Sequence, residues 1–142
     1  MLIKQVSVFV ENKPAALEEV VSILGENNID IYALSLADTT DFGILRLIVS
    51  APDKTKEVLK EKGLIVKRTD VIAIVVEDKP GGLVHTLDVM KKSNINIEYI
   101  YAFIGKNEKG ATVVMKVNNP DEAVKILKDT DVEILTTDEL YK

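Results

Sequence analysis

Apolar residues recur along the chain with two different periods, which predict strands and helices. Within residues 6–10 every second position is a valine, the spacing of one face of a β-strand. Between residues 17 and 24 apolar side chains fall at i, i+3, i+4 and i+7, the spacing of one face of a helix. Pro14 suits the first turn of this helix, and residues 25–28 suit its end. The chain therefore opens with a strand followed by a helix.

Two further strands, a second helix and a last strand follow. Apolar runs at 29–36 and 44–49 flank the polar turn 38–41, which predicts a hairpin. A helix is expected over residues 52–63, and another strand starts at residues 64–66. This part of the chain reads strand, helix, strand, strand, helix, strand.

The second half of the chain repeats the first. The stretch ENKPAAL at residues 11–17 returns as EDKPGGL at 77–83, and NIDI at 28–31 returns as NINI at 94–97 with the same offset. Later matches have a slightly larger offset, so a short insertion separates them. The loop 106–110 is the expected place, because surface hairpins tolerate insertions. An internal repeat of this kind predicts two copies of one folding unit.

Each copy is predicted to be a ferredoxin-like α+β unit. Its βαββαβ order gives a four-stranded antiparallel sheet with both helices on one face. The two units in tandem are expected to be residues 1–69 and 70–142. No Gly, Pro or Ser interrupts residues 64–71, so the units are expected to be rigidly coupled.

The predicted strands are apolar on both faces. Residues 71–76 are all apolar. The strand that follows residue 94 is expected to carry, on one face, Ile95, Ile97, Tyr99, Tyr101 and Phe103. Such an aromatic row is typical of a core or an interface. Because the helices cover one face of each sheet, the sister unit or a second chain must cover the other, and a homodimer is expected.

Composition excludes several classes of function. The 142 residues contain no cysteine and one histidine, so thiol chemistry, disulfides and a histidine metal site are not expected. A net charge of -5 without a basic patch argues against a nucleic-acid partner. No apolar run reaches the roughly 18 residues that span a bilayer, and no signal peptide opens the chain. A cytoplasmic protein with no membrane partner, no metal and no cofactor is expected.

On these motifs the chain resembles a tandem ACT-domain protein. Residues 10–17 with 28–31, and residues 76–83 with 94–97, carry the resemblance, which covers nearly the whole chain in two copies. It implies a small non-enzymatic regulatory protein that binds a free amino acid where ACT domains meet and modulates amino-acid metabolism. The ligand would touch the turn between the first strand and first helix of a unit. Any regulated enzyme is expected to be a separate partner protein.

The resemblance also assigns ligand-contacting positions in both turns. In the second copy they are Asp78, Lys79, Pro80, Gly81, Gly82 and Leu83; in the first copy they are Asn12, Pro14, Ala15, Ala16 and Leu17. Ala15 stands where the family pattern has glycine, which favours the second copy as the primary site.

Elementary chemistry supports a ligand at these turns. A helix start can bind a carboxylate, because it has unpaired N–H groups and the positive end of the helix dipole. Asp78 could pair with an ammonium group, whereas Asn12 could only hydrogen-bond to one. Alternatively, both side chains cap the helices. Gly81 and Gly82 favour a ligand, since glycine in a first helical turn costs up to about 1 kcal/mol; tight packing between domains is the other explanation.

Other polar residues are expected to have lesser roles. Lys13 and Lys79 sit unfavourably beside the positive end of a helix dipole. His85 is expected on the exposed polar face of its helix, as a bystander. Arg46 and Arg68 are too far apart in the repeat to form a phosphate site.

Two kinds of function remain open at this point. The first is an amino-acid sensor, and the second is a ligand-free structural or regulatory subunit of a partner enzyme. A hydrolase resembling acylphosphatase would need an arginine in its phosphate-binding loop, and neither turn has one. RNA recognition would need a basic and aromatic sheet, which this acidic chain lacks.

Overall fold

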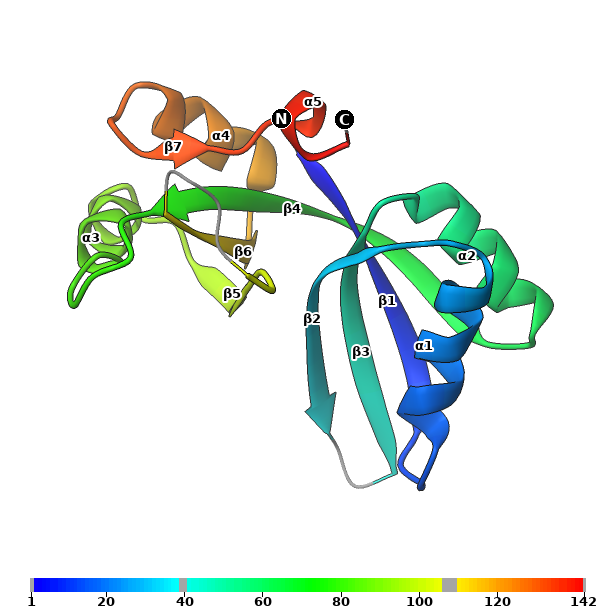
Figure 1. The fold of residues 1–142 in the computed structure, drawn as a ribbon. Coiled ribbons are helices and arrows are strands. Elements are labelled where there is room, and N and C mark those ends of the chain that lie inside the picture. Colours follow the sequence, from blue (N-terminus) through cyan, green and yellow to red (C-terminus); the bar gives the residue numbers. More distant parts are fainter. Residues whose placement is uncertain (1, 39–40, 106–109, 142) are drawn as a thin grey trace. The chain divides into compact units, whose positions relative to one another are not determined.

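The chain folds as two compact units in the computed structural model, which describes residues 2–38, 41–105 and 110–141 (Figure 1). Lys4–Thr69 form unit A, and Asp70–Lys142 form unit B together with the first residues of the chain. Each is an α+β unit with an antiparallel sheet and ferredoxin-like topology, which confirms the predicted fold class.

Unit A follows the predicted order of elements. It contains β1 (Ile3–Glu11), α1 (Ala16–Glu26), β2 (Ile31–Asp38), β3 (Phe42–Val49), α2 (Pro52–Glu61) and the start of β4 (Ile65–Val76). The strand order is β2–β3–β1–β4, and β3 pairs antiparallel with both of its neighbours.

The core of unit A lies between this sheet and its two helices. The alternating valines of β1 are buried there, with Leu45 and Leu47 of β3 on the same face. Val20 and Leu24 of α1 and Leu59 of α2 pack against them. Each such aliphatic side chain stabilises the fold by about 1.5–3 kcal/mol when fully buried. The apolar spacing that predicted the strand and the helix therefore also builds the core.

Unit B repeats this architecture. It continues β4 and adds α3 (Val84–Lys92), β5 (Ile97–Ala102), β6 (Ala111–Val117), α4 (Pro120–Lys128), β7 (Glu133–Ile134) and α5 (Thr137–Leu140). The strand order is β5–β6–β4–β7 with antiparallel pairs. Ile72, Ile74 and Met115 of the sheet pack with Met90 of α3 and Leu127 of α4.

The two helices that follow the repeated turns begin later than predicted. The prediction that Pro14 lies in a first helical turn, which the repeat extends to Pro80, is wrong, because both prolines precede the helix. The reason is the residue after each proline: Ala15 has a φ of 71° and Gly81 a φ of 79°. An α-helix cannot contain a left-handed residue, so α1 and α3 start only after it.

Strand β5 contains a bulge that changes the predicted faces of this strand. The register passes from Ile97 opposite Val117 to Tyr99 opposite Lys116. Ile97 therefore packs in the helix-side core, whereas Tyr99 and Tyr101 lie on the other face with their ring centroids 6.4 Å apart. The prediction of one continuous face is wrong at this point, because the extra residue of a bulge shifts the alternation.

Both predicted hairpin loops lie partly outside the described residues. Residues 39–40 of the turn at 38–41 and residues 106–109 of the loop at 106–110 are not described. The strands that flank each loop are antiparallel neighbours, β2 with β3 and β5 with β6.

Candidate functional site

The two repeated turns share one backbone pattern. We call residues 11–17 the first turn and residues 77–83 the second turn. In the first turn, Lys13 N–H donates to the carbonyl of Glu11 at 2.9 Å; in the second, Lys79 N–H donates to that of Glu77 at 3.0 Å. The repeat therefore preserves a local structure as well as a sequence.

Gly81 is explained by the conformation of the second turn. Its φ of 79° lies in the left-handed region, which glycine adopts without steric cost. A Cβ added to Gly81 would meet no described atom within 4 Å, so crowding is not the reason for glycine. Ala15, at the same place in the first turn, adopts nearly the same φ of 71°. The left-handed conformation of the turn is therefore enough to explain Gly81, which gives no evidence for a ligand.

Gly82 is explained by the backbone of its own turn. An added Cβ would lie 2.0 Å from the carbonyl oxygen of Glu77, far inside contact distance. Gly82 N–H donates to the Lys79 carbonyl at 2.9 Å, and its counterpart Ala16 N–H donates to that of Lys13 at 3.4 Å. Ala16 already begins α1, whereas the second turn continues until α3 begins at Val84. Close approach of the Glu77 carbonyl therefore requires this glycine.

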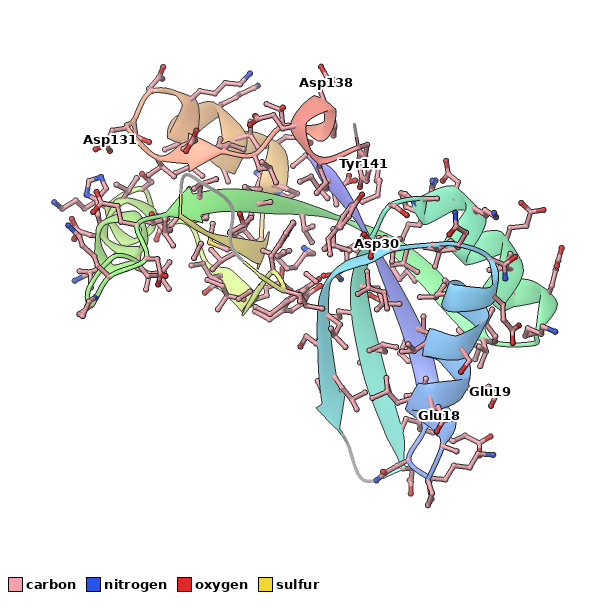
Figure 2. All side chains as sticks on the ribbon, in the orientation of Figure 1. Glu18, Glu19, Asp30, Asp131, Asp138 and Tyr141 are labelled. Carbon is pink, nitrogen blue, oxygen red and sulfur yellow. The ribbon has the colours of Figure 1, made fainter. Side chains whose placement is uncertain are left out.

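The starts of α1 and α3 differ in charge. The N-cap residues of both helices, Ala15 and Leu83, make no side-chain cap hydrogen bond. The first turn of α1 carries Glu18 and Glu19 (Figure 2), whereas that of α3 carries no acidic residue. Acidic side chains offset the positive end of a helix dipole. The first turn of α3 therefore carries less negative charge than that of α1.

A cavity of about 450 Å³ adjoins the second turn. It is lined by Val75, Val76, Glu77, Lys79, Gly81, Gly82, His85, Thr86, Asp131, Val132 and Glu133. We call it the α3 pocket. Its walls are the end of β4, the second turn, the first turn of α3 and the segment that leads into β7. Its volume is within the range of roughly 300–1,000 Å³ that is typical of small-molecule sites.

The cavity beside the first turn is smaller, at about 160 Å³. It is lined by Val10, Glu11, Asn12, Lys13, Ala16, Leu17, Leu36 and Gly43. This volume is below the usual range for a small-molecule site. The hollow of a size suited to an amino acid thus adjoins the second of the two turns.

Only some of the predicted ligand-contacting residues line these cavities. In the second turn Lys79, Gly81 and Gly82 line the α3 pocket, whereas Asp78, Pro80 and Leu83 do not. In the first turn Asn12, Ala16 and Leu17 line the smaller cavity, whereas Pro14 and Ala15 do not. The carboxylates that line the α3 pocket are Glu77, Asp131 and Glu133 in place of the predicted Asp78.

One ion pair of the α3 pocket connects neighbours within the second turn. Lys79 Nζ lies 2.7 Å from Glu77 Oε2, and the corresponding pair of Lys13 with Glu11 is 3.4 Å apart. The hydrogen bond from Lys79 lowers the pKa of Glu77 below its ordinary value, and the same bond raises the pKa of Lys79. The positive charge of Lys79 is therefore directed to a neighbouring carboxylate.

A second ion pair of the pocket joins α3 to the segment before β7. His85 Nε2 lies 2.6 Å from Asp131 Oδ1, and this contact lowers the pKa of Asp131. His85 is 60% exposed, as its place on the polar helix face predicts, and it lines the α3 pocket. Asp131 could not be found from local sequence, because it is 46 residues away from His85 along the chain.

Thr86 is a further pocket residue that motif analysis missed. It lies in the first turn of α3, is 4% exposed and lines the α3 pocket. The repeat contains a signal for it, since Thr86 occupies the place that the buried Val20 has in the first copy. Comparison of the two copies at buried positions would have identified it.

Among the described residues, no group of histidine, aspartate and glutamate side chains is arranged to hold a metal ion. Within the same part of the chain, no helix combines the length and the apolar character needed to cross a membrane.

Comparison with known proteins gives consistent matches. A family model described as an ACT domain pair matches residues 1–142. The crystal structure of protein BT0572 from Bacteroides thetaiotaomicron is 41% identical and covers 100% of this chain and 97% of its own, with a TM-score of 0.92. No protein of curated function matches the sequence.

More distant structures share the fold. The ligand-free regulatory subunit of aspartate kinase from Thermus thermophilus is 14% identical, with coverage of 88% of this chain and 87% of its own and a TM-score of 0.64. The corresponding subunit from Thermus flavus is 14% identical, with coverage of 87% and 86% and a TM-score of 0.62.

Proposed function

The chain belongs to the ACT domain pair family, and from this premise we propose that it is a non-enzymatic regulatory protein that binds a free amino acid in the α3 pocket. One observation carries the proposal: the start of α3 has neither a side-chain cap nor an acidic residue, and it adjoins a cavity of about 450 Å³. A helix start in this state favours a negatively charged group.

The chemistry of the pocket wall suits a zwitterion. The carboxylate of the amino acid would lie at the start of α3, where Gly82, His85 and Thr86 line the cavity. The ammonium group would meet the carboxylates that line the same cavity, Glu77, Asp131 and Glu133. Both charged groups of the amino acid would then have a partner of opposite charge in the pocket.

Regulation would operate through assembly. We propose that the chain forms a homodimer and acts on a separate partner enzyme of amino-acid metabolism. An amino acid changes such an assembly only if it binds one arrangement more tightly than the other. The regulatory subunit of aspartate kinase provides a precedent for this fold alone, because its identity to this chain is 14%.

A thermal-shift panel with the common L-amino acids, each at millimolar concentration, tests the proposal. A ligand present at 100 times its Kd stabilises the native state by about 2.7 kcal/mol, which raises the melting temperature by several degrees. If no amino acid shifts the transition, the sensor is excluded, and the ligand-free regulatory subunit is the better description.

The first copy supplies a matched variant for locating the site. Val84, 64% exposed, occupies the place that Glu18 has in α1. Val84→Glu should leave the fold intact and weaken amino-acid binding about tenfold, because it places a negative charge beside the bound carboxylate. Glu18→Val is the control and should leave binding unchanged. If the parent and Val84→Glu bind the amino acid with equal affinity, the site does not lie at the start of α3.

A further inference from the structure

Thr86 combines burial with an unused hydroxyl group. The residue is 4% exposed, and no donor or acceptor within the described residues pairs with its hydroxyl. Thr55 is the useful contrast, since it is also buried, in α2, and donates to the carbonyl of Ala51 at 2.8 Å. Because this hydroxyl is not among the fully buried, unpartnered polar atoms of the described residues, it keeps contact with solvent and is open to an external partner.

The fold itself does not need this hydroxyl. The first copy has Val20 at the same place, 1% exposed and packed in the core of unit A. Valine and threonine have nearly the same shape but differ in polarity, and a buried valine needs no partner. The second copy therefore has a polar atom where the first copy shows that an apolar one is sufficient.

The position of Thr86 indicates what the hydroxyl could bind. Thr86 lines the α3 pocket, so the small surface that it keeps faces this cavity. It is the third residue of α3, beside the uncapped start of the helix. A hydroxyl donor at this place adds to the N–H groups and the dipole of the helix, all of which favour one oxyanion.

We infer that the hydroxyl of Thr86 donates a hydrogen bond to the carboxylate of the amino acid in the α3 pocket. This inference rests on the proposed function and makes it more specific. The ligand must carry a free α-carboxylate, so the corresponding α-carboxamide binds weakly. It also follows that the first turn, with Val20 and the acidic start of α1, provides no equivalent site.

Three variants test the inference in the full chain. They are Thr86→Val, which installs the residue of the first copy, Thr86→Ser, which keeps a hydroxyl, and Val20→Thr, the reciprocal control. The probe is the L-amino acid that gives the largest thermal shift in the panel, together with its α-carboxamide. Isothermal titration calorimetry measures binding, and urea denaturation measures the stability of the unliganded variants.

The expected results separate a ligand contact from a structural role. Thr86→Val should bind the amino acid about tenfold more weakly, as for the loss of a hydrogen bond to a charged group, and Thr86→Ser should stay close to the parent. The weak binding of the carboxamide should not change in Thr86→Val. Without ligand, Thr86→Val should be at least as stable as the parent, and Val20→Thr should be less stable with unchanged binding.

Every other outcome counts against the inference. If Thr86→Val binds the amino acid as well as the parent, the contact is absent while the proposed function stands. If Thr86→Val is less stable than the parent without ligand, the hydroxyl has a structural role. If no amino acid shifts the parent, the proposed function fails, and this inference fails with it.

Discussion

Both repeated turns hold one residue in the left-handed region, but only the second turn has a glycine there. Ala15 and Gly81 have φ values of 71° and 79°. A residue with a Cβ costs roughly 1–2 kcal/mol more than glycine in this region. The alanine is therefore a strained residue, and the contrast between Pro-Ala-Ala and Pro-Gly-Gly concerns the backbone before it concerns any ligand.

Exchanging these two residues should change stability in opposite directions. Ala15→Gly removes strain but makes the unfolded chain more flexible, so we expect the free energy of unfolding to rise by about 0.5–1 kcal/mol. Gly81→Ala should lower it by a similar amount for the converse reason. Urea denaturation of the parent and both variants measures these differences.

Gly25 provides the control for the exchange. It lies in α1 without a positive φ, and an added Cβ would meet nothing within 4 Å in the described part of the chain. Gly25→Ala should therefore raise the free energy of unfolding by up to about 1 kcal/mol, as expected for a helix. If Gly81→Ala stabilises the protein as Gly25→Ala does, left-handed strain is not the reason for Gly81.

Gly82 should tolerate substitution less well than Gly81. A Cβ at this position would lie 2.0 Å from the Glu77 carbonyl oxygen, and backbone atoms cannot move aside as a flexible side chain can. Gly82→Ala should lower the free energy of unfolding by about 2–3 kcal/mol, at the upper end of overpacking effects. Urea denaturation measures it, and a loss no larger than that of Gly81→Ala would contradict the close contact.

The ion pair of the second turn should be visible in a titration. The hydrogen bond from Lys79 lowers the pKa of Glu77, so the pair stabilises the fold above the ordinary pKa of a glutamate. Its contribution disappears as the pH falls through the lowered pKa. Lys79→Met should raise the pKa of Glu77 toward its ordinary value, which NMR titration of the side-chain carboxyl carbon measures.

A second lysine provides the control for this titration. Lys92 Nζ lies 2.9 Å from Asp88 Oδ2 and lowers the pKa of that carboxyl. Lys92→Met should raise the pKa of Asp88 and leave that of Glu77 unchanged. An unaltered pKa of Glu77 in Lys79→Met would mean that the pair does not form in solution.

Residues of the site differ in how far sequence could predict them. The turn residues were found because the repeat places ENKPAAL over EDKPGGL. Thr86 could have been found in the same way, since its counterpart Val20 is apolar. Asp131 could not, because its contact with His85 depends on the pairing of β7 with β4. Local sequence patterns identify the residues of a turn, whereas the pocket residues that lie far away along the chain, such as Asp131, depend on tertiary structure.

Helices and strands were predicted by period, but their ends and faces depend on finer geometry. The spacing of apolar residues placed α1 correctly, yet it could not reveal that the residue after Pro14 is left-handed and delays the helix. In β5, one extra residue between Ile97 and Tyr99 moves the aromatic row to the other face. Turns and bulges break the regular period on which such predictions depend.

The short helix α5 should depend on its capping box. Thr136 Oγ1 accepts from Glu139 N–H at 3.2 Å, and Glu139 Oε1 accepts from Thr136 N–H at 3.2 Å. Thr136→Ala removes the first bond and should cost about 1 kcal/mol locally. Amide hydrogen exchange at Glu139 should become faster. Thr136→Ser keeps the cap and should exchange at the rate of the parent; equal rates in all three proteins would contradict the capping role.

At the scale of the molecule, the repeat determined the architecture and composition limited the function. Two copies of one apolar pattern build two units of the same topology. The proposed function depends on two differences between the copies: a helix start with acidic residues against one without them, and Val20 against Thr86. Duplication allows one copy to keep a structural role while the other acquires a ligand, because each unit has its own core.

The proposed homodimer makes a last prediction about the edge of unit A. β2 stands at the end of the strand order, and an edge strand with exposed apolar residues favours pairing with another chain. Leu36 of β2 is 49% exposed, and Phe42 at the start of β3 is 55% exposed. We expect the parent to sediment as a dimer and the double variant Leu36→Lys, Phe42→Ser to sediment as a monomer.

The design of this experiment distinguishes the edge from general surface hydrophobicity. Ile65 of β4 is 67% exposed, more than Leu36 or Phe42, so Ile65→Ser removes a comparable apolar surface elsewhere. It should leave the dimer intact if strand pairing at β2 drives association, because isolated exposed apolar residues are common on soluble proteins. A monomeric parent would contradict the homodimer, and dissociation by Ile65→Ser alone would place the interface away from β2. Sedimentation velocity over a range of protein concentrations separates these results, since dissociation of a weakened dimer depends on concentration.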